Sequence, residues 1–167
     1  MTALTVAVPG VTTYLLLVAL CLAPFAVLLA FSGHPAYRRL PSVLRTGLPM
    51  FSGIAGVMVA VIWLWLISAN GVWRSDDALL VRASRVFSAE IALSALRPAE
   101  ARAQSLATLT AAGRIRAPGY AAGWYRDNAG TRVFVLYAGT ELQRIPTTQG
   151  FDLALGIVDA QALQPAP

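Results

Sequence analysis

The chain has few of the residues from which metal and disulfide sites are built. Its 167 residues include one cysteine, Cys21, and one histidine, His34. A single cysteine excludes an internal disulfide and a cysteine-rich zinc site, and a single histidine excludes a multi-histidine metal site. We therefore expect neither a metal nor another cofactor.

Charge is scarce too, and lysine is absent. Charged residues make up 13% of the chain and hydrophobic residues 57%, whereas a soluble domain averages about 25% charged residues. All thirteen basic residues are arginines, and they are scattered along the chain rather than clustered. The scatter argues against a nucleic-acid-binding surface, and the scarcity of charge indicates a membrane protein.

Two long uncharged runs lie in the first half of the chain. Residues 11–31 and about 50–69 are each long enough to cross a bilayer core of about 30 Å as a helix. Pro24 predicts a kink in the first run. The second ends in "WLWLISANGVW", where tryptophans are typical of a membrane interface. The sequence thus predicts a membrane anchor over residues 1–73.

The first run does not look like a cleaved or lipidated leader. Its opening segment "MTALTVAVPG" lacks the basic residues that signal peptides normally carry. Cys21 is preceded by Leu20 rather than a small residue, and apolar sequence follows it, so lipidation is disfavoured. We interpret Cys21 as a small apolar residue within a span.

The segment between the two runs predicts the orientation. Residues 32–49 contain Arg38, Arg39 and Arg45 but no acidic residue. Short basic loops stay on the cytoplasmic side of the membrane. We therefore expect a cytoplasmic loop, with the C-terminal domain outside the cytoplasm.

Small residues recur in the second run at four-residue spacing, at Ser52, Gly56 and Ala60. Such spacing permits close approach of two helices. We expect this face to pack against the first span, with homodimerisation as the less favoured alternative.

Residues 74–167 have the pattern of a small all-β domain. Residues 79–90 suggest one strand or two, and residues 91–96 another. Further strand-like segments are "SLATLT", "AAGWYR", "RVFVLY", "LQRIPT" and "FDLAL". Their spacing of about 8–12 residues is typical of a sandwich or barrel. A short helix is predicted over residues 158–163.

Turn residues separate these segments. Pro118 and Gly119 form one turn, and "RDNAGT", with Gly130, forms a hairpin loop. We expect the Asp127 side chain to bond the backbone of its own hairpin.

The segments "RIRAPGYAAGWYRDNAG" and "RVFVLYAGTELQRIPTTQGFDLAL" resemble bacterial pleckstrin-homology-like (PH-like) domains of small membrane-anchored proteins. The matching features fall on Arg114, Gly119, Tyr120, Gly123, Trp124, Tyr125, Gly130, Val133, Val135, Ile145 and Thr147. The resemblance implies a seven-stranded bent sandwich closed by a C-terminal helix, in the inner membrane of a bacterium. It implies no catalytic residues.

The candidate binding residues lie in the same region. Because side chains alternate along a strand, we expect Trp124 in the core and Tyr125 outside it. Gly119, Gly123 and Gly130 are expected to be structural. The candidate binding set is Arg114, Arg116, Arg126 and Tyr125. No spacing of carboxylates, phosphate-loop motif or metal motif indicates a catalytic residue.

The sequence therefore predicts a non-enzymatic, membrane-anchored interaction or adaptor protein. Its expected partner is another envelope or membrane protein, or a second copy of the chain. The alternative is direct binding of lipid headgroups or a small ligand by the β-domain. An envelope enzyme with an unrecognised site is the less favoured third hypothesis.

Overall fold

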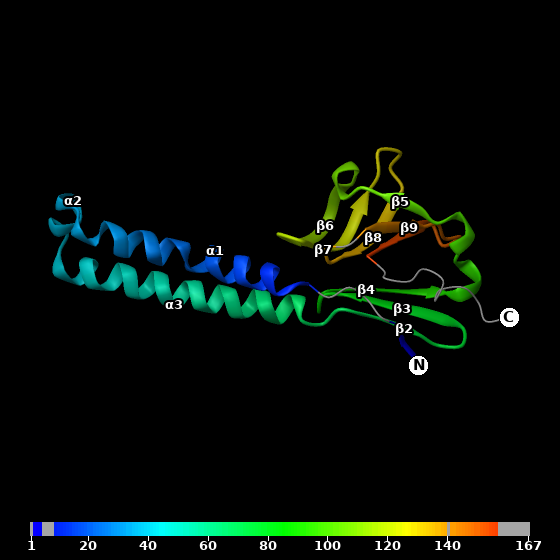
Figure 1. The fold of residues 1–167 in the computed structure, drawn as a ribbon, viewed down its shortest axis with the longest axis horizontal. Coiled ribbons are helices and arrows are strands. Elements are labelled where there is room, and N and C mark those ends of the chain that lie inside the picture. The colour runs from blue at the N-terminus through cyan, green and yellow to red at the C-terminus, as the bar shows by residue number, and fades with distance from the viewer. Residues whose placement is uncertain (1, 5–8, 140, 157–167) are drawn as a thin grey trace. The chain divides into compact units, whose positions relative to one another are not determined.

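The computed structural model describes residues 2–4, 9–139 and 141–156. The chain divides into two compact units, one formed by residues 11–65 and the other by residues 1–10 together with 66–167. The short helix predicted over residues 158–163 lies outside the described residues. Figure 1 shows helices in the first unit and mainly strands in the second.

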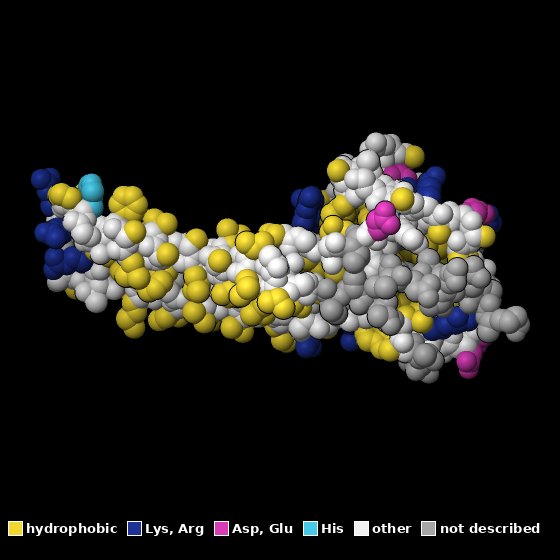
Figure 2. Space-filling view, in the orientation of Figure 1, with side chains coloured by type: hydrophobic (Ala, Val, Ile, Leu, Met, Phe, Trp, Pro, Cys, Tyr) yellow, Lys and Arg dark blue, Asp and Glu magenta, His cyan; other side chains and the backbone are white. Residues whose placement is uncertain are grey.

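The helical unit is a hairpin of two long helices, α1 (Val11–Ala30) and α3 (Ser42–Ile67). Between them lie η1 (Phe31–Gly33) and α2 (Pro35–Arg38). Both long helices are long and apolar enough to cross a membrane. Apolar side chains cover the face shown in Figure 2, and arginines gather at the α2 end beside the histidine.

The second helix begins at Ser42, earlier than the uncharged run that predicted it. It contains Pro49, which lacks an N–H and so leaves the carbonyl of Arg45 without its helical partner. The Tyr37 hydroxyl donates to that carbonyl at 2.6 Å. A substitute donor therefore lets the helix continue through Pro49, and much of the predicted 32–49 loop is helical.

The two helices pack through small residues of α3. A Cβ atom added to Gly56 would lie 2.6 Å from the carbonyl oxygen of Cys21, and one added to Gly53 would lie 3.2 Å from the Phe25 ring. Ala60 is buried. The prediction that the small-residue face packs against the first span is confirmed at Gly56.

The first sheet has the antiparallel order β1-β2-β3-β4. Its strands are β1 (Thr2–Leu4), β2 (Gly71–Arg74), β3 (Ala78–Ala83) and β4 (Phe87–Ala92). Strand β1 precedes α1, whereas its partner β2 follows α3, with Ala3 opposite Trp73. The β-domain therefore takes in residues on both sides of the helical hairpin, which the predicted boundary at residue 74 does not anticipate.

The second sheet has the order β5-β9-β10-β8-β7-β6. Its strands are β5 (Arg102–Gln104), β6 (Thr110–Ala117), β7 (Tyr120–Arg126), β8 (Arg132–Tyr137), β9 (Leu142–Ile145) and β10 (Phe151–Leu155). Neighbours are antiparallel except β8 and β10, which are parallel. The short turns η2 (Leu93–Ala95) and η3 (Pro98–Glu100) lead from the first sheet to β5.

The second sheet is strongly curved, as the length of one connection shows. Strands β5 and β6 are its two edges, yet only residues 105–109 join them. In a flat sheet the edges would lie about 24 Å apart, whereas a connection of this length spans at most about 20 Å when extended. It includes the compact turn η4 (Leu106–Thr108), so the sheet must curl to bring its edges closer.

Both faces of the second sheet are covered. One face packs towards the first sheet, with contacts between β3 and β8 and between β4 and β7 (Figure 1). On the other face a cluster of buried residues includes Tyr125, Val133 and Val135, and residues 105–109 supply Leu109 to it. We call residues 105–109 the strap, because they cross this face from one edge strand to the other.

The mainly-β expectation is confirmed, but its details differ. The described strands form two sheets, of four and six strands, that do not close into a barrel, whereas the resemblance implies a bent sandwich of seven strands. The segment "SLATLT" forms η4 and not a strand. Strand β6 was not predicted, because its sequence "TAAGRIRA" is rich in small residues that rarely form strands.

Candidate binding site

The predicted arginine set is divided between the two faces of the curved sheet. On β6, Arg114 and Arg116 lie opposite Gly123 and Ala121 of β7. Paired residues share a face, so both arginines lie on the strap face with Tyr125. Arg126 pairs with Arg132, whose guanidinium covers the Trp124 ring on the other face. The structure thus brings Arg114, Arg116 and Tyr125 together and separates Arg126.

The expected roles of Trp124 and Tyr125 are reversed. Tyr125 is fully buried, whereas Trp124 is partly exposed. Trp124 makes edge-to-face contacts with Phe134 and Phe151, at centroid distances of 4.8 and 5.2 Å. The prediction failed because it assumed one open face of β7, and the strap buries the face that Tyr125 occupies.

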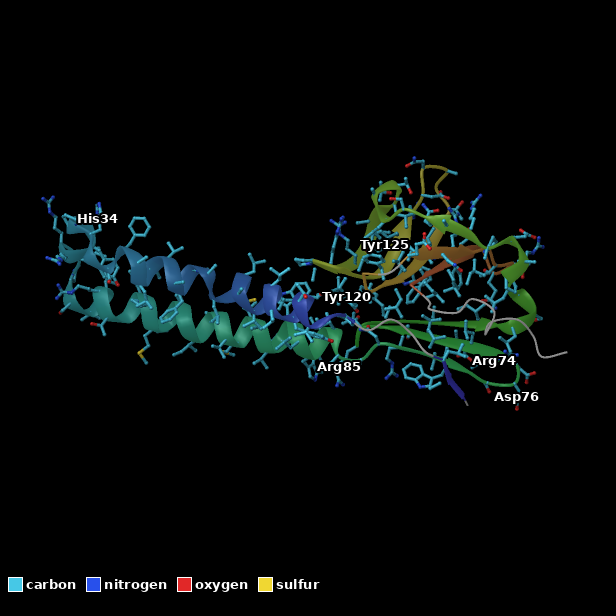
Figure 3. The ribbon with its side chains drawn as sticks, in the orientation of Figure 1. His34, Arg74, Asp76, Arg85, Tyr120 and Tyr125 are labelled. Atoms are coloured by element: carbon cyan, nitrogen blue, oxygen red, sulfur yellow. The ribbon has the colours of Figure 1, made fainter. Side chains whose placement is uncertain are left out.

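The Tyr125 hydroxyl is a buried donor without a hydrogen-bond partner among the described residues. Burial raises the pKa of this phenol, and the positive charges of Arg114 and Arg116 reduce the rise without reversing it. The Arg114 guanidinium is thus close enough to act on the phenol, although it does not hydrogen-bond to it with good geometry. Figure 3 shows Tyr125 among the side chains of the curved sheet.

A cavity of about 470 Å³ opens at the β6–β7 end of the strap face. It is lined by Leu106, Arg116, Ala117, Pro118, Gly119, Tyr120 and Tyr137. Gly119 has a φ of 70°, a conformation that glycine adopts at little cost, so the predicted Pro-Gly turn is confirmed. The cavity therefore combines a guanidinium, two tyrosines and exposed turn backbone.

Asn70 joins this turn to the end of α3. Its side-chain oxygen accepts from the Tyr120 hydroxyl and from the Ser84 amide, both at 2.8 Å, and its amide nitrogen donates to the carbonyl of Ile67 at 2.7 Å. Ile67 is the last residue of α3. One side chain thus links the last residue of the helix to the start of β7 and to Ser84, which directly follows β3.

The two tyrosines of β7 give a matched pair for testing this hydrogen bonding. Tyr120→Phe should destabilise the domain by about 1 kcal/mol, because the hydroxyl donates to Asn70. Tyr125→Phe should be neutral or slightly stabilising, because its hydroxyl is buried without a partner. Thermal unfolding of the full chain in mild detergent, followed by tryptophan fluorescence, measures both. Equal losses for the two variants would contradict the assignment.

Gly123 lets β7 approach β6 closely. Its φ is 117°, and a Cβ atom there would lie 2.5 Å from the Gly113 carbonyl oxygen. Gly130 also has a positive φ, of 83°, in the hairpin between β7 and β8. Gly119, Gly123 and Gly130, for which structural roles were predicted, thus all have positive φ values.

An ion cluster that the sequence did not reveal lies beside the strap-face core. Arg144 on β9 is 5% exposed. Its Nη2 lies 2.8 Å from Asp127 and 2.6 Å from Asp152, and its Nε donates to Asp152 at 2.6 Å. Asp127 also accepts from the amides of Ala129 and Thr131, as predicted for its hairpin. The cluster ties the β7–β8 loop to β9 and β10.

The cluster favours the charged forms of Arg144 and Asp127. Burial, the largest influence, lowers the pKa of the Arg144 guanidinium, but the two carboxylates together outweigh it and the net shift is upward. The hydrogen bond from Arg144 is the main cause that holds the pKa of Asp127 below its ordinary value. The arrangement is a structural ion cluster rather than a proton donor for catalysis.

The lowered pKa of Asp127 predicts acid sensitivity. Because the folded-state pKa lies below the unfolded value of 3.8, the stabilisation is complete above about pH 4 and is lost as the pH falls further. Asp127→Asn should therefore reduce the difference in stability between pH 6 and pH 3. Asp76→Asn, at an exposed carboxylate in the β2–β3 turn (Figure 3), is the control that should leave that difference unchanged.

Among the residues that the structure describes, no group of histidine, cysteine, aspartate and glutamate side chains is able to hold a metal ion. The chain matches no protein-family model. It also matches no curated protein and no solved structure to a significant degree.

Proposed function

We propose that this chain is a non-enzymatic interaction protein that holds a PH-like β-domain at a bacterial cytoplasmic membrane. The two long apolar helices are its anchor. The basic segment between them favours a loop in the cytoplasm and a β-domain outside it. The PH-like assignment rests on the sequence resemblance over residues 113–155.

The observation that carries the proposal is the outer edge of β6, which pairs with no further strand among the described residues. This strand ends the six-stranded order, and residues 110–114 on it are all exposed. Ala111, Ala112 and Gly113 give it small side chains, which leave the backbone N–H and C=O groups open to another strand. An extended segment of a partner protein binds such an edge by adding a strand to the sheet.

The shape of the edge favours a short segment of another protein over a second copy. A bulge between Ala111 and Gly113 interrupts the regular register of β6. Bulges discourage long edge-to-edge pairing of sheets, whereas a short extended peptide needs only a few backbone hydrogen bonds. We therefore assign the edge to a linear segment of another envelope or membrane protein.

Site-specific photo-cross-linking tests the proposal in the native membrane. A photoreactive residue at position 112 of the full chain should give a discrete adduct with one protein, and one at position 128, in the exposed β7–β8 loop, should not. Equal adducts at both positions, or none at either, would contradict it. An adduct of twice the mass of the chain would assign the edge to self-association instead.

A matched pair of lysine substitutions sharpens the test. Gly113→Lys places a charge on the edge, which opposes strand addition, and an added Cβ there meets no described atom within 4 Å. It should abolish the adduct at position 112 without unfolding the domain. Asn128→Lys should leave the adduct intact. A reporter enzyme fused after Pro167 tests the orientation, since activity restricted to the cytoplasm would reverse it.

A further inference from the structure

The backbone groups of Arg114 and Arg116 are directed to the outer edge of β6. A two-residue turn joins Ala117 to β7, and the register of the two strands is regular from Gly113 to Ala117. The pair that closes such a turn is hydrogen-bonded, and hydrogen-bonded and open pairs then alternate along the ladder. The Gly113 carbonyl, in phase with the closing pair, is accordingly directed at β7, since a Cβ atom on Gly123 would lie 2.5 Å from its oxygen. Arg114 and Arg116 belong to the intervening pairs, so their N–H and C=O groups point away from β7.

The side chains of Arg114 and Arg116 share one face and lack an acidic partner. Both are exposed, and both lie on the strap face, because they pair with Gly123 and Ala121, two residues apart on β7. Neither forms an ion pair within the described part of the chain, unlike Arg144, which lies between two carboxylates. A strand added to β6 would therefore place two of its own residues, two positions apart, beside two uncompensated guanidinium groups.

We propose that the extended segment that adds to β6 carries acidic side chains at alternate positions, opposite Arg114 and Arg116. Opposite charges that face each other on neighbouring strands stabilise the pairing, and a guanidinium binds a carboxylate through two parallel hydrogen bonds. The residue between the acidic ones lies on the other face, beside Ile115, whose side chain is buried, and it is therefore apolar. The inference rests on the proposed strand addition and specifies the chemistry of the partner.

The same two charges oppose pairing with a second copy of the chain. Two β6 edges in register would bring the arginines of one chain opposite those of the other, and like charges in that position destabilise a sheet. Charged side chains on edge strands prevent association of this kind. An acidic segment meets attraction at the same edge, so Arg114 and Arg116 select a partner by the sign of its charge.

Fluorescence anisotropy on the full chain in uncharged detergent tests the charge preference. The probe is a short labelled peptide in which glutamate alternates with valine, and two matched peptides carry glutamine or lysine in place of glutamate. We expect the glutamate peptide to bind about fivefold or more tightly than the glutamine peptide, and the lysine peptide to bind most weakly. Equal affinity for all three would overturn the acidic assignment but leave the proposed strand addition standing, whereas no binding of any peptide would contradict both.

Reversal of the two charges distinguishes direct contact from a structural role. Arg114→Glu/Arg116→Glu should exchange the preference, so that the lysine peptide binds more tightly than the glutamate peptide. Arg126→Glu alters an arginine of the same hairpin on the opposite face, and it should keep the native order of affinities. A double variant that still prefers the glutamate peptide would refute the proposal.

Amide hydrogen exchange of the native chain, resolved by NMR, tests the pairing without any substitution. The amides of Arg114 and Arg116 should exchange fast in the free protein and slowly with the glutamate peptide bound. The Ile115 amide, which is directed at β7, should exchange slowly in both states. Binding that leaves the two arginine amides unprotected would show attraction by charge alone, and would refute strand addition at this edge together with the proposed function.

Discussion

Arg144→Leu is expected to lower the free energy of opening of β8–β10 by about 3–5 kcal/mol. The substitution removes the guanidinium but leaves Asp127 and Asp152 facing each other beside the core. Removal of one partner of a buried ion cluster leaves uncompensated charge, which costs far more than the intact cluster contributes. Hydrogen exchange of the β8 and β10 amides in the full chain measures this free energy.

An exposed ion pair in the same domain serves as the control. Arg97 and Glu100 lie 3.3 Å apart, and their side chains are 55% and 56% exposed. Because water screens such pairs, Arg97→Leu should change the opening free energy by less than about 1 kcal/mol. If the two substitutions had similar effects, burial would not be what makes the Arg144 cluster important.

Gly56→Leu is expected to separate α1 from α3. An added Cβ would lie 2.6 Å from the carbonyl oxygen of Cys21, and backbone cannot move aside as a flexible side chain can. Overpacking of this kind costs about 1–3 kcal/mol, and contacts between membrane helices depend on close packing. The expected result is a lower unfolding temperature in detergent and faster exchange of amides in both helices.

Two other glycines of α3 provide a graded series. A Cβ on Gly53 would approach the Phe25 ring at 3.2 Å, and one on Gly47 meets no described atom within 4 Å. Gly53→Leu should therefore have an intermediate effect. Gly47→Leu should be neutral or slightly stabilising, since leucine favours helix over glycine. A uniform loss across the three positions would indicate that the small residues serve another purpose than packing.

The sequence predicted best those elements that depend on the residues of a single short segment. The two long helices follow from uncharged runs, and the turn at Gly119 and the hairpin at Gly130 follow from residues that tolerate positive φ. The sequence did not show which side chains of β7 would be fully buried. Alternation says that Trp124 and Tyr125 lie on opposite faces, but it does not indicate that the strap, which supplies Leu109 to the cluster around Tyr125, covers the Tyr125 face.

The remaining features depend on residues that are distant in the chain. Asp127 and Asp152 meet Arg144 through strand order and the β7–β8 loop, and none of the three carries a motif. An arginine within the apolar segment "LQRIP" is the one local signal, since a charge on a buried strand needs a partner. The pairing of β1 with β2 has no local signal, because the whole helical hairpin separates the two strands.

The pairing of β1 with β2 fixes the order in which parts of the fold form. Strand β1 is synthesised first, but its hydrogen-bonding partner appears only after α3 is complete. With α1 and α3 in a bilayer, the two strands meet only if the hairpin has crossed twice, so that both lie on the same side. On the proposed membrane anchorage, the edge of the first sheet would therefore form only after insertion: a chain whose second helix failed to cross would leave β1 and β2 on opposite sides of the membrane.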